Sequence, residues 1–418
     1  MQPTINKLFA FTTLVFILHK GHAQTNSLSS SPYSLYGLGL DNEISTGKTN
    51  SLGGLGLAMP SDSFINNSNP ASMAHIPLNS FFFDFGFKAQ SNNLSEGNDN
   101  NSNLISNFSN ISIAFPISKK SGLSLTLIPF TQVGYSIADL ESDIEGSSTA
   151  TYTTDINGSG GINDLKLNYG YALTDKLSLG ITGSALFGTI NQTETSYLPY
   201  NTLEIETENY YAGVQAGLGF QYKILPSTSI GGTVTFPTRL NGSKTNNVVL
   251  SNTSTSTTIE DDTESHLKDF EIPFEFGLGV QTAFKKHFTL NIDYKHNLWG
   301  NTNQTDKIGQ YVNQDFISMG LQFANEKKPA HFFNNLEYRL GLNYNTGNLQ
   351  IDRERITKKS VNLGIGIPLN NETNSMVNIG YTYGSQGRIS SGLIKDNYHL
   401  FSINLSLEGI WFQKRKIF

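Results

Sequence analysis

The chain of 418 residues contains no cysteine and few charged residues. The absence of cysteine excludes a disulfide framework, thiol catalysis, zinc held by cysteine ligands and a lipidated cysteine anchor. Charged residues make up only 15% of the chain, yet hydrophobic residues make up only 37%. Asn, Ser, Thr and Gly replace the missing charge, and they suit strands and turns better than helices. The formal net charge of −6 argues against nucleic acid as a partner, because such binding needs a basic surface.

Long apolar runs are also missing. No stretch of 18 apolar residues occurs beyond Gln24, which excludes a bundle of spanning helices. Residues 1–23 predict a cleavable signal peptide, with Lys7 as the positive residue, an apolar run from Leu8 to Leu18, and small residues around Ala23. That run is about a dozen residues, short of the roughly 20 that a spanning helix needs. The protein is therefore expected to be exported.

Alternation of apolar and polar residues dominates from residue 79 onward. It is clearest in the segments Phe288 to Tyr294 and Phe401 to Leu407. A secreted β-sandwich would alternate too, but many runs here reach the roughly 10 residues of a membrane strand, against about 5 to 6 in ordinary sheets. Their polar positions carry Gly, Ser, Thr, Asn and Gln instead of the Lys and Glu of a solvated surface. The pattern predicts an all-β protein, a transmembrane antiparallel β-barrel with an apolar lipid face and a polar lumen.

Turn signals divide the alternating region into about 14 strands, and closed single-chain bacterial barrels have an even number. The predicted strands are 79–91, 107–118, 122–138, 148–173, 176–194, 205–223, 227–250, 260–284, 287–299, 312–324, 336–346, 355–368, 374–384 and 398–407. Short connections alternate with long ones, and the long ones are predicted at 92–106, 195–204, 300–311 and 385–397. Short turns belong to the periplasm and long loops to the cell exterior.

Charge follows the same alternation along the chain. The short connections are rich in lysine, whereas acids occupy the predicted external loops at Asp139 to Glu145, Glu204 to Glu208 and Glu260 to Glu264. These carboxylates either keep the loops soluble or bind divalent cations shared with anionic outer-leaflet lipid. Both interpretations stay open at this point.

Residues 24–78 show no alternation of apolar and polar residues, so they must lie elsewhere than in the predicted strands. A barrel of about 14 strands is wider than the eight-stranded kind that side chains can fill, so we expect these residues to form an N-terminal hatch inside it. Within them Asn69 can cap a short helix that has Pro70 at its first position and Ala71 next. The predicted organisation is a signal peptide at 1–23, a hatch at 24–78 and a barrel at 79–418.

The hatch region carries a resemblance to a known family. The run from Ser51 to Ala58 (SLGGLGLA), followed by Asn66 to Ser72 (NNSNPAS), resembles the start of FadL/TodX-type outer-membrane proteins, in a divergent branch. The resemblance implies a 14-stranded barrel whose hatch contains the Asn69-Pro70-Ala71 motif. It also implies passive uptake of small hydrophobic compounds, such as long-chain fatty-acid-like ligands.

Members of that family release ligand sideways beside a kinked third strand. In this chain the predicted third strand contains Pro129 and, five residues later, Gly134. Proline cannot donate a ladder hydrogen bond, so this composition permits a kink and a lateral gate. The alternative is that Pro129 is tolerated at a bulge with no opening.

Five charged residues fall on the predicted lumen face of the strands. They are Asp84, Lys88, Asp293, Lys295 and Arg339. We expect them to form lumen salt bridges or to hold the hatch instead of contacting a substrate.

No catalytic constellation is visible in the sequence. The six histidines beyond the predicted signal peptide are scattered without metal-ligand spacing, and no Gly-x-Ser-x-Gly elbow occurs. We therefore expect no enzyme activity, no cofactor and no metal site. The expected partners are outer-membrane lipid, a hydrophobic small molecule and the barrel-insertion machinery, for which the resemblance implies an assembly signal at Trp411, Phe412 and Phe418.

A second function fits the same architecture. The protein could be a non-transporting structural barrel, an accessory subunit of an outer-membrane secretion or assembly complex. A continuous apolar cavity between hatch and wall would favour uptake, and a lumen packed solid by side chains would favour the structural function.

Overall fold

The computed structural model describes the chain from Ser31 to Ile410, except residues 43–45, 55, 98, 145–150, 303, 305–308, 326–331, 371 and 391. The predicted signal peptide and the predicted assembly signal at Trp411, Phe412 and Phe418 lie outside these residues. Within them no helix is long and apolar enough to cross a membrane.

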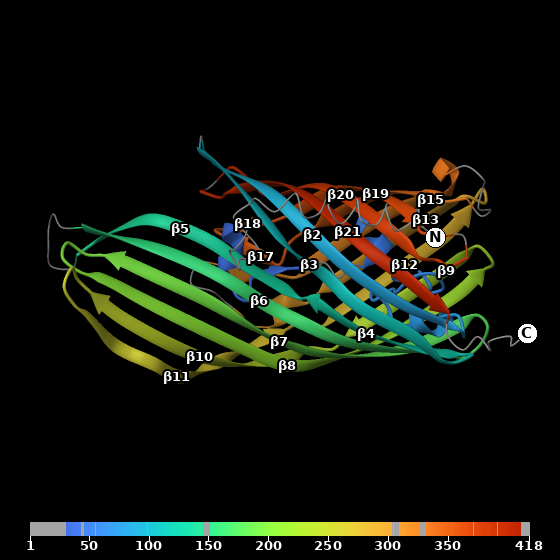
Figure 1. Ribbon diagram of the computed structural model, residues 1–418, viewed down its shortest axis with the longest axis horizontal. Helices are drawn as coiled ribbons and strands as arrows, with labels where there is room; N and C mark the ends of the chain where they lie inside the picture. Colours follow the sequence, from blue (N-terminus) through green and yellow to red (C-terminus); the bar gives the residue numbers. More distant parts are fainter. Residues whose placement is uncertain are drawn as a thin grey trace, which may run out of the picture.

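Fourteen wall strands form a closed antiparallel barrel around short hatch elements (Figure 1), which confirms the predicted fold class and strand number. The wall strands are β2 (Ser80–Glu96), β3 (Asp99–Ser118), β4 (Ser121–Pro129) continued by β5 (Thr131–Asp143), β6 (Thr151–Ala172), β7 (Leu177–Tyr197), β8 (Thr202–Leu225), β9 (Thr228–Thr235) continued by β10 (Thr238–Ser251), β11 (Ser256–Ile272) continued by β12 (Glu275–Phe284), β13 (Phe288–Asn297), β15 (Gln314–Phe323), β16 (Glu337–Asn345), β19 (Lys358–Pro368), β20 (Met376–Gly387) and β21 (Lys395–Ile410). The first and last strands, β2 and β21, pair from Ser80↔Ile410 to Ser95↔Lys395 and close the barrel.

Three wall strands are interrupted, and a proline stands at each interruption. Pro129 ends β4, Pro237 separates β9 from β10, and Pro273 separates β11 from β12. Because proline lacks the N–H that a ladder needs, it ends or bends the pairing locally. These breaks let the wall strands change direction and pairing partner.

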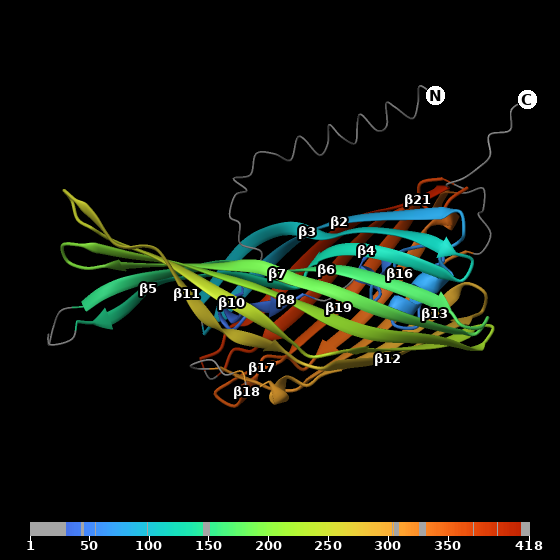
Figure 2. The same ribbon diagram turned by 90° about the horizontal axis from the view of Figure 1, so that it is seen from below.

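The remaining elements are short. The hatch contains η1 (Pro32–Leu35), β1 (Leu40–Asp41), η2 (Gly47–Ser51) and η3 (Pro70–His75), and a turn contains η5 (Phe332–Asn335). Near one end of the barrel lie η4 (Trp299–Asn301) and a small sheet of β14 (Gly309–Tyr311), β17 (Leu349–Ile351) and β18 (Glu354–Arg355), visible in Figure 2. The alternation pattern did not predict this small sheet, because its strands have only two or three residues.

The strand β8 shows where the lipid face ends. Val214 and Leu218 point outward and are exposed, whereas Gly217 and Gly219, on either side of Leu218, are buried against the interior. On the same outward face beyond Tyr210 the residues become acidic. Tyrosine is enriched at the boundary between hydrocarbon and water, so we place the outer edge of the membrane near Tyr210.

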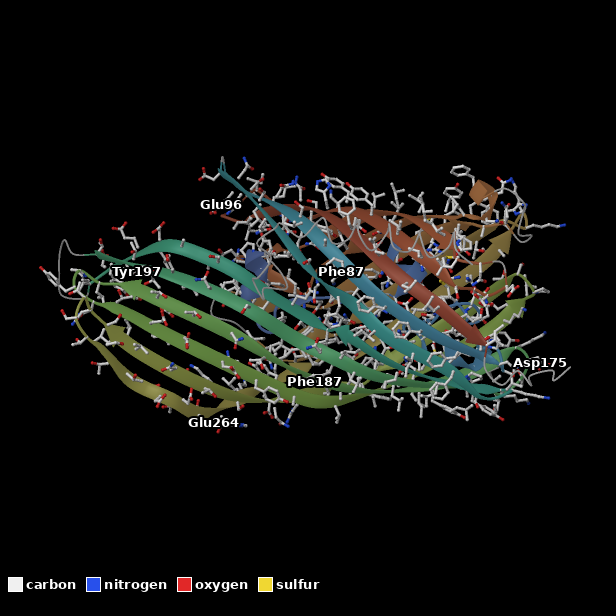
Figure 3. The ribbon with its side chains drawn as sticks, in the orientation of Figure 1. Phe87, Glu96, Asp175, Phe187, Tyr197 and Glu264 are labelled. Carbon is white, nitrogen blue, oxygen red and sulfur yellow. The ribbon has the colours of Figure 1, made fainter. Side chains whose placement is uncertain are left out.

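Several strands continue far past that boundary. β6, β7 and β8 have 22, 21 and 24 residues, about twice the roughly 9–11 that a spanning strand needs. With β5, β10 and β11 they extend from one end of the barrel, on the left of Figure 1. Figure 3 marks Tyr197 on this extension and Asp175 in a short turn at the opposite, periplasmic end. We call the projecting part the extracellular sheet (residues 133–143, 151–161, 189–197, 202–210, 243–251 and 256–266).

The predicted long loops at 92–106, 195–204 and 385–397 are therefore wrong. β2 and β3 are joined by residues 97–98, β7 and β8 by 198–201, and β20 and β21 by 388–394. The fourth loop, predicted at 300–311, contains η4 and β14. Lipid imposes apolar alternation only at membrane depth, but the hydrogen-bonded ladder continues wherever two strands stay paired. The acids assigned to loops consequently lie on β5, β8 and β11.

Replacing Leu218 by Arg should destabilise the folded barrel by about 2–4 kcal/mol, because an arginine on the lipid face at membrane depth loses its hydration. The matched control is Glu206→Arg, on the same outward face of β8 but beyond Tyr210, where the cost should stay within about 0.5 kcal/mol. Urea unfolding in lipid vesicles measures both variants. An equal cost at the two positions would contradict the membrane boundary near Tyr210.

Candidate functional site: the hatch, its seat and the lateral gap

The Asn69-Pro70-Ala71 motif forms the start of η3. The Asn69 Oδ1 accepts a hydrogen bond from the backbone N–H of Ala71 (3.0 Å), and Pro70 occupies the first turn, where its missing N–H costs nothing. The Asn69 Nδ2 donates to the carbonyl oxygens of Leu57 (2.7 Å) and Phe220 (2.9 Å). One fully buried amide thus ties η3 to a second hatch segment and to the barrel strand β8.

Other buried amides hold the rest of the hatch together. The Asn66 Nδ2 donates to the carbonyls of Gly56 and Met59, both at 2.7 Å. From the wall, the Gln221 Nε2 donates to the carbonyls of Leu57 (3.0 Å) and Met59 (2.9 Å). Since leaving a buried polar group unpaired costs about 1–3 kcal/mol, these bonds strongly favour the seated position of the hatch.

The hatch backbone lies directly against glycines of the wall. A Cβ added at Gly170 would stand 2.6 Å from the backbone N of Ala74, and one at Gly341 would stand 2.5 Å from the backbone N of Gly53. Both distances are shorter than real Cβ contacts, so a side chain at either position would displace the hatch. Similar overlaps occur around the lumen at positions that we call the glycine seat: Gly122, Gly170, Gly180, Gly219, Gly231, Gly320, Gly341 and Gly364.

The predicted lumen charges all bond to the hatch or to neighbouring wall residues. The Asp293 Oδ1 accepts from the backbone N–H of Leu57 (3.1 Å), and the Lys88 Nζ donates to the Asn42 Oδ1. Two of the five charges therefore hold the hatch.

The other three charges make polar contacts within the wall. Buried Asp84 accepts from Asn110 and from Ser406. Lys295 pairs with Glu275 at 2.7 Å, and Arg339 pairs with Glu337 at 2.6 Å. Among the residues that the structure describes, no ion pair joins two of the five predicted charges. The acidic partners Glu275 and Glu337 were missed, although alternation with Gly277 and Arg339 places them on the same inward faces.

Two partly buried charges of the hatch itself were also missed. The ammonium of Lys48 stands 4.2 Å from the ring centroid of Phe64, and burial lowers the pKa of Lys48. Asp41, in β1, accepts from the Asn348 Nδ2 (3.1 Å). Burial, with a smaller contribution from the Glu275 carboxylate, raises the pKa of Asp41 to about 6. Asp41 therefore becomes less compatible with the seated hatch as it ionises.

The apolar part of the lumen is filled by side chains. Leu38 of the hatch is 4% exposed and packs with Val133, Ile162, Leu186 and Leu240, each 1% exposed or less. Edge-to-face aromatic contacts extend the packing, with Phe270 lying 6.3 Å from Trp299 and 6.1 Å from Tyr311 between ring centroids. We call this set the apolar core cluster; it also includes Tyr135, Ile190 and Ile272.

Two small pockets lie between the hatch and the wall, one of about 160 Å³ and one of about 230 Å³ beside Lys48 and Phe64. The first is lined by the charged residues Asp41, Lys88, Lys358 and Asp396, by several Asn, Gln and Tyr side chains, and by aliphatic side chains that include Leu40 and Leu349. A long apolar chain would have to displace hydration from these charged groups, at a cost of several kcal/mol without new partners. The charged part of the first pocket is therefore suited to water or a small polar solute.

The wall is incomplete beside Pro129 and Gly134. β4 pairs with β3 only from Ile111 to Ser118 of β3, and β5 pairs with β6 and with β1 of the hatch. Between β3 and β5 lies a groove of about 820 Å³, whose apolar lining includes Leu104 and Ile137. We call this break in the ladder the lateral gap.

The hatch takes the place of β3 beside β5. Leu40 pairs with Gln132, and the Ser34 Oγ both donates to the Gly134 carbonyl (2.9 Å) and accepts from the Gly134 N–H (3.0 Å). Asn42 adds a hydrogen bond from its Nδ2 to the carbonyl of Pro129 (2.7 Å). Nothing in the sequence around Ser34 or Leu40 indicated these contacts, because they join segments about 90 to 100 residues apart.

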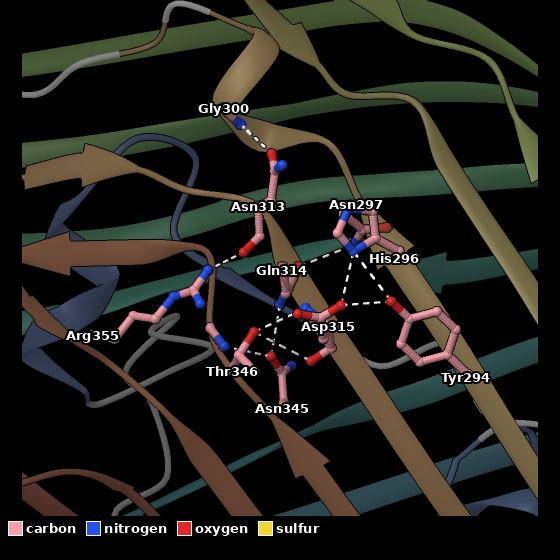
Figure 4. A network of polar contacts seen from close by, with 11 residues as sticks. Tyr294, His296, Asn297, Gly300, Asn313, Gln314, Asp315, Asn345, Thr346 and Arg355 are labelled. Carbon is pink, nitrogen blue, oxygen red and sulfur yellow. Dashed lines mark hydrogen bonds and ion pairs between the residues drawn. The ribbon is translucent and has the colours of Figure 1, made fainter.

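A polar cluster links the extracellular ends of β13, β15 and β16 (Figure 4). The Asp315 Oδ1 accepts from the Tyr294 hydroxyl (2.7 Å) and lies 2.8 Å from the His296 Nδ1. The Asp315 N–H donates to the Thr346 Oγ1 (2.8 Å). The cluster therefore ties the extracellular ends of three neighbouring wall strands together.

The acids of the extracellular strands do not converge. No group of three or more His, Asp or Glu that could hold a metal ion occurs among the described residues. Glu145, part of the predicted acidic rim, lies outside them.

Solved structures with the same architecture are outer-membrane channels. The chain is similar to the CymD monoaromatic hydrocarbon channel (15% identity, TM-score 0.61, covering 90% of this chain and 100% of that one). It is also similar to the Pseudomonas putida toluene transporter TodX (14%, 0.62, 89% and 100%) and to a Pseudomonas aeruginosa FadL homologue (11%, 0.57, 89% and 98%). No curated protein matches the sequence.

The barrel, its interior hatch and these likenesses define the class: an outer-membrane β-barrel with a FadL-like channel fold. Within that class the chain belongs to the BamG family, whose sequence profile matches residues 5–418. The resemblance to FadL/TodX-type proteins therefore holds for the fold, and the family is BamG.

Adding a methyl group at Gly180 should loosen the hatch. A Cβ there would overlap the backbone of Pro70 and Ala71, whereas a Cβ at Gly183 on the same strand meets nothing within 4 Å. We expect Gly180→Ala to destabilise the seated hatch by about 1–3 kcal/mol and Gly183→Ala to be nearly neutral. Limited proteolysis of the hatch in the folded barrel measures the difference. Equal protection in the two variants would contradict the glycine seat.

The stability of the seated hatch should fall as pH rises from about 4 to 6. The folded-state pKa of Asp41 is raised, so the folded protein holds this proton more tightly and loses that advantage once pH exceeds the folded pKa. Asp41→Asn should therefore stabilise the protein at pH 8, by on the order of 1 kcal/mol, with little gain at pH 4. Thermal unfolding in detergent at both values tests this. A gain independent of pH would contradict it.

Proposed function

We propose that the protein is a non-transporting structural barrel and an accessory subunit of an outer-membrane barrel-assembly complex. The observation that carries the proposal is the filled interior. The glycine seat and the buried amides hold the hatch against the wall, and the apolar core cluster packs Leu38 of the hatch against buried wall residues. A lumen occupied in this way supports a structural function over conduction.

The family and the shape support the same proposal. The family name, BamG, follows the naming of the barrel-assembly machinery, and its profile matches nearly the whole chain. The extracellular sheet adds surface outside the membrane that a minimal channel does not require. An accessory subunit needs such additional surface to contact other members of a complex.

Purification of the full-length protein from its own outer membranes in a mild detergent tests the proposal. We expect the central barrel-insertion protein to copurify in fixed stoichiometry, measured by native mass spectrometry, and depletion of this chain to lower the yield of other folded barrels. Isolation as a free barrel, with normal barrel assembly in its absence, would refute the proposal.

A second candidate function is passive uptake of small hydrophobic compounds. The observation that favours it is the lateral gap, since its groove of about 820 Å³ has apolar lining residues from β3 and β5. The toluene transporter TodX and the monoaromatic hydrocarbon channel CymD have the same fold. On this hypothesis Pro129 and Gly134 form the kink of a lateral gate.

Restoring the ladder at Pro129 separates the two functions. If the lateral gap conducts, Pro129→Val should lower uptake of toluene or oleate by cells expressing the protein several-fold. Pro116→Val, within the paired part of β3, serves as the control. Undiminished uptake in Pro129→Val, or purified protein that carries no extractable hydrophobe, would remove support for transport.

A further inference from the structure

The pockets of about 160 and 230 Å³ beside the hatch lie on opposite sides of η2. Asn50 of η2 lines the first pocket, and Lys48, two residues earlier, lines the second. The first is also lined by Leu349, from the connection between the extracellular ends of β16 and β19, and we call it the extracellular pocket. The second is also lined by exposed Asn374, from the short turn between β19 and β20, and we call it the periplasmic pocket. Two positions of one five-residue element therefore face different pockets.

The strand β21 passes both pockets and shows how thin the barrier between them is. Ser402 lines the extracellular pocket, and Ser406 lines the periplasmic pocket. The inward residue between them is Asn404, whose Oδ1 accepts a hydrogen bond from the Asn50 Nδ2 (2.8 Å). At about 3.3 Å per residue, Ser402 and Ser406 stand about 13 Å apart along the strand. The barrier is therefore about as thick as one helix with its side chains.

The wall is polar on both sides of this barrier. Asn362 of β19 pairs with Thr382 of β20, and both line the extracellular pocket. Four residues away on β20, Asn378 lines the periplasmic pocket and pairs with Asn404. Amide and hydroxyl groups both donate and accept hydrogen bonds, so water and small polar solutes are suited to both pockets.

Close packing of η2 against the wall closes the interval between the pockets. A Cβ added at Gly364 of β19 would overlap the Ser51 side chain. Beneath Asn50, the Asn404 Nδ2 donates to the Asn110 Oδ1 (2.9 Å). Asn404 and Asn110 are each 1% exposed or less, so water does not reach the wall under η2. A polar solute therefore cannot pass along this wall while η2 stays in place.

Different parts of the wall hold η2 and η3. The element η3 packs mainly on β4, β6, β7 and β8, whereas η2 packs mainly on β19, β20 and β21. Asn69 ties η3 to β8, and Asn50 ties η2 to β21. A substitution on one side of the lumen can therefore loosen one element while the other keeps its contacts.

We propose that η2 is the seal of a polar path through the lumen. The path runs from the extracellular pocket along β19, β20 and β21 to the periplasmic pocket, and it admits water and small polar solutes once η2 leaves its seat. It is separate from the lateral gap, whose groove lies between β3 and β5. The inference goes beyond the proposed function and does not depend on it, because a structural barrel and a channel for hydrophobic compounds both have to exclude polar solutes from the lumen.

Conductance of the full-length protein in planar lipid bilayers tests the proposal with a matched pair of glycines. Gly364→Ala places a methyl group against Ser51 of η2, and Gly180→Ala places one against the backbone of η3. In potassium chloride we expect a closed wild type and at least ten times its current in Gly364→Ala, because the seal is displaced. Gly180→Ala should stay within twofold of the wild type. Equal currents in the two variants, or a Gly364→Ala barrel as closed as the wild type, would overturn the proposal.

A substitution within η2 provides a second test that leaves the wall unchanged. Asn50→Asp replaces the amide donor by a carboxylate, which the Asn404 Oδ1 repels. We expect arabinose to enter liposomes that contain this variant at least five times faster than liposomes with the wild type. Asp62→Asn, at an exposed hatch residue, is the control and should leave the rate unchanged. If an Asn50→Asp barrel whose heat-modifiable migration in gels shows it folded excludes arabinose as well as the wild type does, the seal is refuted.

Introduced cysteines locate the path, because the chain has no cysteine of its own. Ser402 lies in the extracellular pocket, and Ile403 lies next to it on the lipid face. Both substitutions are made in the Gly364→Ala protein and treated with a positively charged, water-soluble thiol reagent. The current should fall at least fivefold with Ser402→Cys and stay unchanged with Ile403→Cys. A current that the reagent reduces in neither protein would mean that solutes pass elsewhere, and the proposed path would be wrong.

Discussion

The close contact between the hatch backbone and the glycine seat is the constraint on which the interior depends. Backbone can approach backbone this closely only where no Cβ intervenes, and the wall provides such positions on six strands around the lumen, at Gly122, Gly170, Gly180, Gly231, Gly320 and Gly341. Once the hatch is that close, the amides of Asn69 and Gln221 can reach its carbonyls. The part of the lumen on the extracellular side of the hatch is then narrow enough for the side chains of the apolar core cluster to fill it.

Seating the hatch also determines how the wall closes. Pro129 interrupts the third wall strand, and the edge of β5 that loses β3 gains the hatch residues Leu40 and Ser34 instead. The hatch is thus both a filling of the lumen and a part of the wall. Because Ser34 of the hatch bonds to Gly134, the backbone N–H and carbonyl of Gly134 stay paired although β3 does not reach β5 beside the lateral gap.

Much of the architecture could be predicted from the sequence because lipid imposes a simple rule on every spanning strand. Alternation, as in Phe288 to Tyr294, predicted a fourteen-stranded barrel, and Asn69 caps the short helix that its position before Pro70 predicted. The rule ends at Tyr210. Beyond it the ladder continues without apolar alternation on the lipid side, so the strand ends that form the extracellular sheet were assigned to loops.

The sequence by itself determined the class of fold. It also determined the inward position of residues such as Asp293, because each side chain of a strand points to one of only two faces. Only the tertiary structure decided what those residues contact: Asp293 holds Leu57, and Leu38 completes the apolar core cluster. Glycines at alternate positions of the wall strands could be recognised in the sequence. The hatch residues that they contact could not, because these lie up to about 300 residues away in the chain. Local patterns specify the face of a strand, whereas contacts across a lumen depend on how all strands close around one hatch.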